Sequence, residues 1–165
     1  MPATSSPLIR CSWTSPLGPV TLAARDQRLA GLWFDGQKHQ PDPSGWQVQP
    51  QHPVLLHAKA QLDEYFAGAR KHFDLPLDLG AGTPFQQRVW AGLLGIAAGT
   101  TWTYAALGRS IGRPDAVRAV AAAVGRNPLS IVVPCHRVIG SNGALTGYAG
   151  GLDRKAALLQ REQQQ

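Results

Sequence analysis

A cysteine and a histidine stand side by side at positions 135 and 136, directly after a proline and an apolar run. A thiolate is a strong nucleophile, and cysteine needs less activation than serine or threonine to attack an electrophilic carbon. A neighbouring histidine can accept the thiol proton, or lower the thiol pKa through its positive charge. Cys135 and His136 therefore predict nucleophilic chemistry at the sulfur.

The segment that leads to this pair is apolar. Residues Ser130–Val133 predict a buried strand. Adjacent residues of an extended segment point to opposite faces, so Cys135 and His136 would not touch if the extended geometry continued through them. A proton transfer between them needs a turn at this point, or a water molecule between Sγ and the imidazole.

Two short helices joined by a glycine are predicted upstream of the cysteine. Thr103 can cap the first, Tyr104–Ile111, and Gly112 ends it. The second follows Pro114 and begins near Asp115. This spacing is typical of a helix-turn-helix.

The second of these helices is predicted to have two unlike faces. Valines and an alanine recur at helical spacing and predict a buried stripe, Val117, Val120, Ala121 and Val124. The other face carries Asp115, Arg118, Ala119, Ala122 and Arg126. Small side chains let a helix approach a partner closely, and arginines can bind phosphates. We expect Arg118, Ala119, Ala122 and Arg126 to contact DNA. Without Cys135 nearby, the same face would be better explained as a solvated helix of good helix formers.

The positive charge of the chain is concentrated in its second half. The net charge is +6 over 165 residues, with seven basic and seven acidic residues in 1–80 against nine and three in 81–165. Such an asymmetry indicates a polyanionic partner for the second half. No apolar stretch is long enough to cross a bilayer, and residues 1–7 lack the pattern of a signal peptide. We expect a cytoplasmic protein whose two cysteines, Cys11 and Cys135, are reduced.

The fold class predicted is α+β. Residues 1–80 are expected to form a small N-terminal α/β unit with a β-sheet, and residues 81–165 a mostly helical C-terminal domain with the helix-turn-helix. The predicted elements of the first unit are strands at Ile9–Thr14, Val20–Ala24 and Leu29–Phe34, a loop at Asp35–Pro53 and a helix at Val54–Phe66. The second is predicted to open on a helix with a capping box, Thr83-Pro84-Phe85-Gln86, and to end on a helix from Leu152 to about Glu162.

The second half resembles one family, the O6-alkylguanine-DNA alkyltransferases (methylated-DNA–protein-cysteine methyltransferases). The motifs that carry the resemblance stand in the family's order: Tyr104, Arg118-Ala119-Val120, Gly125-Arg126-Asn127-Pro128, Pro134-Cys135-His136-Arg137-Val138-Ile139, Gly143, Tyr148-Ala149-Gly150-Gly151, Arg154-Lys155 and Glu162. The resemblance covers about half of the chain.

The resemblance implies a proton relay at the nucleophile. Cys135 would be the alkyl acceptor, His136 would deprotonate it through a water molecule, and Glu162 would orient His136. Asn127 would brace the turn beneath the site. Tyr104 would hydrogen-bond the guanine ring as it leaves.

The resemblance also implies a base pocket and a DNA-binding helix. Val138, through its backbone, would line the pocket together with Tyr148 and Ala149, and Arg118 would fill the gap left by a flipped nucleotide. Two positions depart from the family pattern. Ala121 stands where familiar members carry glycine, and Ala149 lacks a hydroxyl found in some members, which leaves recognition of guanine O6 to a backbone N–H.

The reaction implied is a direct transfer that each molecule performs once. The target base is flipped out of duplex DNA, and the thiolate attacks the O6-alkyl carbon to give a stable thioether. The partner is double-stranded DNA containing O6-alkylguanine, bound by a protein that is a monomer in solution and can cluster on DNA. No cofactor is needed. Some members bind a structural zinc in the first half, but the scattered histidines here, His39, His52, His57 and His72, lack metal-ligand spacing.

Three other functions fit part of the pattern. A helix-turn-helix regulator with a structural cysteine would bind one sequence and have an inert thiol. A non-catalytic binder of alkylated DNA would lack the nucleophile that Cys135 provides. A cysteine hydrolase would turn over and would not need the basic helix.

Overall fold

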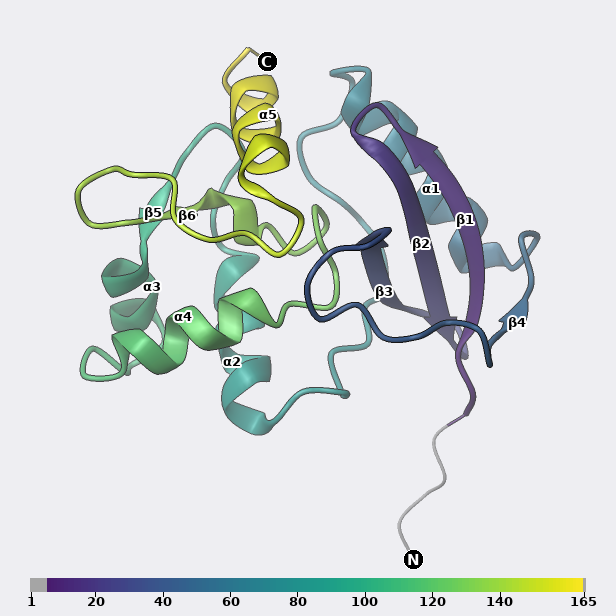
Figure 1. Ribbon diagram of the computed structural model, residues 1–165, viewed down its shortest axis with the longest axis horizontal. Coiled ribbons are helices and arrows are strands. Elements are labelled where there is room, and N and C mark those ends of the chain that lie inside the picture. The colour runs from purple at the N-terminus through teal and green to yellow at the C-terminus, as the bar shows by residue number, and fades with distance from the viewer. Residues whose placement is uncertain (1–5, 165) are drawn as a thin grey trace, which may run out of the picture.

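The computed structural model describes residues 6–164 and confirms the predicted α+β class, with a sheet in the first half and helices in the second (Figure 1). The sheet has the order β3-β2-β1-β4, from β1 (Ile9–Ser15), β2 (Gly18–Arg25), β3 (Arg28–Phe34) and β4 (Gln47–Val48). The first three were predicted. Strand β4 lies in the segment predicted as loop, where its two residues pair in parallel with β1.

Helix α1 (Pro53–Phe66) packs against β1, β2 and β3. The side chain of His52 caps it, because Nδ1 accepts a 3.2 Å hydrogen bond from the backbone N–H of Val54. The helix buries one face, on which Leu55, Leu62 and Tyr65 are fully buried. Helix α1 thus closes one side of the sheet and directs Tyr65 into the interior.

Helix α2 (Pro84–Leu93) opens the second half with the predicted capping box. Thr83 Oγ1 accepts from the backbone N–H of Gln86 at 3.1 Å, and Gln86 Oε1 accepts from the N–H of Thr83 at 2.9 Å. The buried indole of Trp90 donates to the carbonyl of Ala123 at 2.8 Å. This bond fixes α2 against the helix that carries the predicted DNA-binding face.

The helix-turn-helix consists of α3 (Tyr104–Ser110) and α4 (Val117–Gly125). Thr103 caps α3 as predicted. The predicted buried stripe of α4 is partly wrong. Val120 and Val124 are buried, but Val117 is exposed and Ala121 half-buried, while Ala123 is buried instead. The helix begins two residues later than predicted, and its contact with Trp90 turns Ala123 inward.

The buried strand predicted at Ser130–Val133 is wrong. These residues are buried but form a turn in which Ile131 has φ +72°. A short 3-10 helix, η1 (Cys135–Arg137), follows directly, and the strand lies after it, where β6 (Val138–Ile139) pairs in parallel with β5 (Trp102–Thr103). Burial explains the apolar composition, while hydrogen bonds from Asn127, described below, hold the chain in a turn.

The two halves share one hydrophobic core, which α5 (Leu152–Gln163) helps to close through Leu158. The outer edge of β3 pairs with other segments of the chain. At Leu32, the N–H donates to the carbonyl of Pro128 at 2.8 Å and the carbonyl accepts from Ser130 at 3.0 Å. Leu29 exchanges similar bonds with Pro76 and Asp78. Within residues 6–164, no helix combines the length and the apolar character that a membrane span requires.

Candidate active site

Cys135 lies at the first residue of η1, where the chain leaves the buried turn. Its N–H donates to the carbonyl of Val133 at 2.8 Å, and the residue is 5% exposed. It contributes to the wall of a pocket of about 460 Å³, a size within the range of small-molecule sites. The sulfur is thus held in the interior and faces an open cavity.

Asn127 holds this turn from below. Its Oδ1 accepts from the N–H of Leu129 at 2.9 Å, and its Nδ2 donates to the carbonyl of Val133 at 2.8 Å. Asn127 is itself buried. The amide therefore satisfies backbone groups on both sides of the left-handed residue Ile131, in the place where the sequence suggested a brace.

His136 is fully buried and contacts the final helix. Its Nε2 lies 2.7 Å from Oε2 of Glu162. An ionised carboxylate only accepts, so Nε2 carries the hydrogen and Nδ1 holds the free lone pair. Nδ1 has no hydrogen-bond partner within the described part of the chain. The 3-10 turn at Cys135 supplies the change of direction that a proton relay between the two residues needs.

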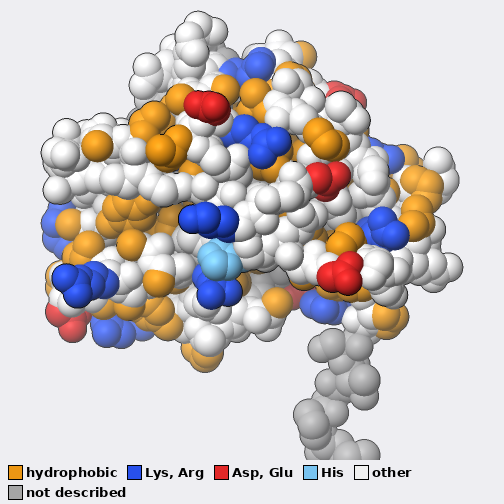
Figure 2. Space-filling model, in the orientation of Figure 1, with side chains coloured by type: hydrophobic (Ala, Val, Ile, Leu, Met, Phe, Trp, Pro, Cys, Tyr) orange, Lys and Arg blue, Asp and Glu red, His pale blue; other side chains and the backbone are white. Residues whose placement is uncertain are grey.

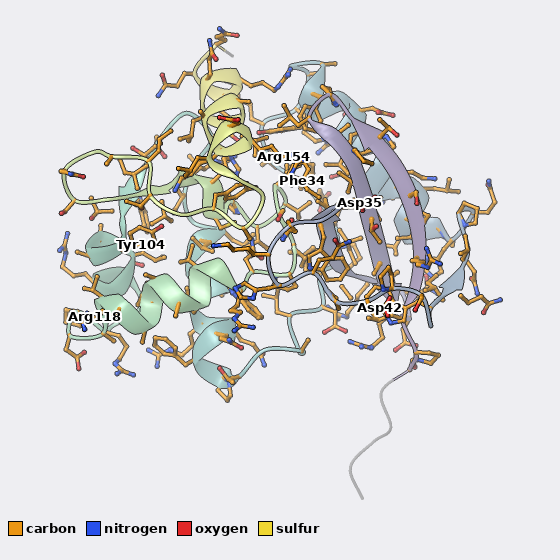
Figure 3. All side chains as sticks on the ribbon, viewed as in Figure 1. Phe34, Asp35, Asp42, Tyr104, Arg118 and Arg154 are labelled. Atoms are coloured by element: carbon orange, nitrogen blue, oxygen red, sulfur yellow. The ribbon has the colours of Figure 1, made fainter. Side chains whose placement is uncertain are left out.

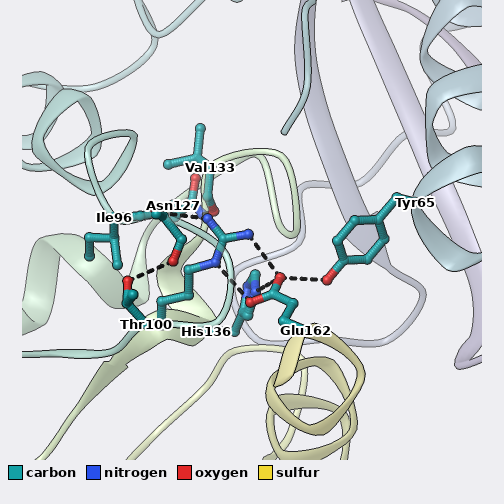
Figure 4. Close-up of polar contacts among 9 residues, drawn as sticks. Tyr65, Ile96, Thr100, Asn127, Val133, His136 and Glu162 are labelled. Atoms are coloured by element: carbon teal, nitrogen blue, oxygen red, sulfur yellow. Dashed lines mark hydrogen bonds and ion pairs between the residues drawn. The ribbon is translucent and has the colours of Figure 1, made fainter. Parts of the chain in front are cut away.

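Glu162 accepts more hydrogen bonds than the sequence suggested (Figure 4). Arg137 donates to Oε1 through Nε at 2.8 Å and to Oε2 through an Nη at 2.9 Å, and the hydroxyl of Tyr65 donates to Oε2 at 2.6 Å. Burial would raise the pKa of the Glu162 carboxyl, but hydrogen bonds from His136 and Arg137 outweigh it and lower that pKa to about 2. Glu162 is therefore an anion at neutral pH.

Burial shifts the pKa of the Cys135 thiol and the pKa of the His136 imidazole. Burial raises the pKa of the Cys135 thiol to about 11, although a hydrogen bond from Asn127 and the charge of Lys155 act in the opposite direction. Burial also lowers the pKa of His136, and its bond to Glu162 offsets this only in part. The resting pair at neutral pH is therefore a thiol and a neutral imidazole, and deprotonation of the thiol needs a base.

Lys155, which appeared above only as part of the Arg154-Lys155 motif, is a further residue of the site. It is fully buried, and its Nζ donates to the carbonyls of Val138 at 2.6 Å, Thr146 at 2.7 Å and Gly147 at 3.4 Å. Burial lowers its pKa to about 8. The ammonium group ties the loop over the pocket to β6, directly after the cysteine turn.

The structure brings most of the expected base-binding residues to the pocket. Tyr104, Tyr148 and Ala149 line it, and Tyr104 accepts a 3.3 Å bond from the hydroxyl of Thr146. Val138 is fully buried and does not line the pocket. Ala121 adds its methyl group to the wall, because α4 presents this position to the cavity and not to the core.

Two residues of the first half also line the pocket, and sequence patterns gave no sign of them. Lys38 and His39 belong to the loop between β3 and β4 and are exposed. The N–H of Lys38 donates to the carbonyl of Ala149 at 3.1 Å. The pocket is thus built from both halves of the chain.

The exposed face of α4 lies beside this pocket. Arg118, Ala119, Ala122 and Arg126 are all exposed. Arg118 lies near the start of α4, and Tyr104 at the start of α3 (Figure 3). Basic side chains and a single histidine stand out on this side of the molecule (Figure 2). The helix therefore presents small and basic side chains next to the opening that leads to Cys135.

Neither a disulfide nor a metal site is present in residues 6–164. Cys11 and Cys135 are both buried free thiols. No group of three or more His, Cys, Asp or Glu side chains is placed to hold a metal ion within this range. Cys11 lies in β1, in the core of the first half.

Comparison with known proteins gives consistent matches over nearly the whole chain. Residues 84–164 match the family model "6-O-methylguanine DNA methyltransferase, DNA binding domain", and residues 9–79 match "6-O-methylguanine DNA methyltransferase, ribonuclease-like domain". A methylated-DNA–protein-cysteine methyltransferase of Mycobacterium leprae is 46% identical over 159 residues, which are 96% of this chain and 94% of that protein. A constitutive one from Bacillus subtilis is 47% identical over 155 residues, 90% of this chain and 91% of that protein.

Solved structures agree with this assignment. The crystal structure of Mycobacterium tuberculosis OGT in complex with DNA has a TM-score of 0.86 and 46% identity, and covers 93% of this chain and 91% of that one. The O6-methylguanine-DNA methyltransferase of Pyrococcus kodakaraensis has a TM-score of 0.63 and 26% identity, with 94% and 98% covered. The chain belongs to the 6-O-methylguanine DNA methyltransferase family.

Proposed function

We propose that this protein repairs O6-alkylguanine in duplex DNA by moving the alkyl group irreversibly onto the sulfur of Cys135. One observation supports this above all: Cys135 lines a pocket of about 460 Å³, while the adjacent His136 offers a free Nδ1 and is held by the ionised Glu162. The protein is a methylated-DNA–protein-cysteine methyltransferase that acts once per molecule. No feature of the site favours a helix-turn-helix regulator.

The chemistry follows from the three groups. The thiol proton passes through a bridging water to Nδ1 of His136, whose Nε2–H points at Glu162. The thiolate then attacks the O6-alkyl carbon, the carbon–oxygen bond breaks, and the guanine oxygen takes the electron pair. A hydrogen bond from Tyr104 helps to neutralise the leaving base. The product is a thioether, which has no ready route back to a thiol.

DNA binding places the base in the pocket. A guanine within a duplex is out of reach, so it must be rotated out of the stack. The Ala119 and Ala122 face lets α4 approach the minor groove closely, Arg126 binds phosphate, and Arg118 occupies the gap left by the base. Recognition of O6 falls to a backbone N–H of the loop that carries Tyr148 and Ala149. Val138 does not line the pocket, and its carbonyl instead accepts a hydrogen bond from Nζ of Lys155.

We also propose how the protein is organised and where it acts. We assign residues 1–80 to a structural domain and residues 81–165 to the catalytic and DNA-binding domain. The protein works in the cytoplasm, as a monomer in solution that can cluster on DNA. The reaction needs no cofactor.

Intact-mass analysis tests the proposal directly. The protein is mixed with a duplex that contains one O6-methylguanine, and with the matched undamaged duplex. We expect a gain of one methyl group per protein with the damaged duplex only, located by peptide mapping on Cys135. Turnover beyond one equivalent, or an unmodified Cys135, would overturn the assignment.

A further inference from the structure

Tyr65 is a buried phenol of the first half that reaches the catalytic cluster of the second. The residue lies on α1 and is fully buried, with its ring against Phe66 at 5.1 Å and Phe73 at 5.4 Å between centroids. Packing alone would be served by a phenylalanine. The hydroxyl instead donates a 2.6 Å hydrogen bond to Oε2 of Glu162, which is 97 residues away in the chain.

The oxygen that Tyr65 contacts is the same one that holds His136. Oε2 of Glu162 lies 2.7 Å from Nε2 of His136 (Figure 4). Arg137 also reaches it at 2.9 Å, whereas Oε1 accepts only the 2.8 Å bond from Arg137 Nε. Each hydrogen bond to a carboxylate stabilises its negative charge and lowers its basicity, so donors that share one oxygen weaken it as an acceptor for one another. A bond from Tyr65 therefore reduces the pull of Glu162 on the imidazole N–H.

The charge states make this bond a strong one. Burial, and after it the negative charge of Glu162, raises the pKa of Tyr65 well above its usual value, so the phenol keeps its proton. Glu162 is ionised at neutral pH. An O–H donor on a carboxylate gives a short, charge-assisted hydrogen bond, as the 2.6 Å distance indicates.

The other charged groups around the cluster are the cations Arg137, Arg161 and Lys155. Burial lowers the pKa of Lys155 to about 8, so this group loses its charge within the tested pH range in the parent and in every variant alike. Burial raises the pKa of the nearby Tyr148 phenol well above its usual value, so that group stays neutral. Arg137 and Lys155 act on His136 and disfavour its protonation, and Arg161 acts on Tyr65. Arg161 is held elsewhere, since it donates to the carbonyl of Phe66 at 2.9 Å. Of these three cations, only Arg137 donates to Oε2 of Glu162.

We propose that Tyr65 is a positioning residue of the Cys135–His136–Glu162 relay, whose hydroxyl fixes Glu162 and limits the basicity of His136. The inference rests on the proposed function of this site. It gives the first half of the chain a part in the chemistry that its sequence does not suggest. The relay then has four members, one of which comes from α1.

The test compares pH profiles of thiol alkylation in a Cys11→Ser background, so that only Cys135 reports. Iodoacetamide labelling is followed by intact mass between about pH 5 and pH 10. Tyr65→Phe removes the hydroxyl and keeps the ring. Glu162 then binds the imidazole N–H more strongly, His136 becomes more basic, and the acid limb of the profile moves to higher pH by roughly half a unit to one unit.

A second variant carries the opposite expectation. Replacing Tyr65 by 3,5-difluorotyrosine keeps the shape and makes the phenol a stronger donor, so the acid limb moves to lower pH. Because it barely perturbs packing, it also serves if Tyr65→Phe folds poorly. Phe73→Leu is the matched control, since Phe73 packs on the same ring without touching Glu162. We expect Phe73→Leu to lower the free energy of unfolding and to leave the pH profile of thiol alkylation unchanged.

The outcomes separate the inference from the proposed function. Profiles of both Tyr65 variants that coincide with the parent would overturn the positioning role, as would equal shifts in the Phe73→Leu control. Failure of the parent to gain a methyl group from damaged duplex would overturn the proposed function instead. Iodoacetamide reports the state of Cys135 in either case, because it needs no DNA.

Discussion

The backbone N–H of Lys38 donates a 3.1 Å hydrogen bond to the carbonyl of Ala149. This bond holds the β3–β4 loop at the pocket, which the exposed Lys38 lines. We predict that Lys38→Ala weakens duplex binding and reduces the slope of log K against log[salt] by about one, as expected for one lost phosphate contact. Fluorescence anisotropy at several salt concentrations measures the affinity for the duplex and its dependence on salt.

A matched control for this variant is Lys71→Ala, because Lys71 is also exposed but does not line the pocket. It should leave the salt slope unchanged. Equal slopes for the parent and Lys38→Ala would exclude a phosphate contact at Lys38.

Cys135→Ser should abolish methyl transfer and leave DNA affinity close to that of the parent. The sulfur supplies the nucleophile, whereas the exposed charge lies on α4 and the pocket rim. Intact mass measures transfer and anisotropy measures binding. Cys11→Ser, which changes a thiol buried in the sheet, should retain transfer to Cys135. Methyl transfer by Cys135→Ser would refute the acceptor role.

His136→Ala should slow single-turnover repair by about 100-fold, the size of effect expected from the loss of a general base. Deprotonation of the buried thiol would then depend on hydroxide, so raising the pH should recover part of the rate. Quench-flow measurements at several pH values test this, with circular dichroism to show that the fold is retained. A rate near that of the parent at neutral pH would mean that His136 takes no proton.

Glu162→Gln should destabilise the fold by about 3 kcal/mol at pH 7, because it leaves the buried Arg137 without its counter-charge. The folded pKa of Glu162 is about 2, against an ordinary value of 4.5. Its contribution is therefore fully present above pH 4.5 and is lost as the pH falls toward 2. Urea unfolding of both proteins should show a constant difference above pH 4.5 that narrows below it. A difference that stays constant down to pH 2.5 would contradict this.

Arg118→Ala should slow repair of duplex DNA by an order of magnitude or more, and leave the reaction with free O6-benzylguanine unchanged. Holding the stack open matters only when the base must leave a duplex, and unstacking costs a few kcal/mol. Single-turnover rates at saturating protein measure this without a contribution from affinity. If saturating protein restores the full duplex rate, Arg118 only binds phosphate.

The elements that could be predicted are those with a local signal. The capping box was correct because the hydrogen bonds between Thr83 and Gln86 close within three residues. The first three strands were correct because each is a short apolar run bounded by a turn. The strand predicted at Ser130–Val133 was wrong because a buried turn and a buried strand have the same apolar sequence. The hydrogen bonds of the Asn127 side chain hold this segment as a turn.

The site was predictable only through its motifs. Cys135, His136 and Glu162 lie together, but the second donor to Oε2 of Glu162, beside His136, is Tyr65, which is far away in sequence. A lysine on a helix usually lies at the surface, but Lys155 is fully buried. The contact of Tyr65 with Glu162 is set by the packing of the two halves, and no periodic pattern in the sequence indicates it.

The pairing of β3 with the segments around Pro76 and Pro128 has a consequence for self-association. A bare edge strand offers unpaired N–H and C=O groups to any other strand, including that of a second molecule. Here Leu29 and Leu32 have their outward groups satisfied within the same chain, and at Leu32 the partner is the segment that leads to Cys135. The part of the chain that delivers the nucleophile thus also shields the sheet. A fragment cut after residue 80 would keep the partners of Leu29 but expose the edge at Leu32, where we expect it to self-associate.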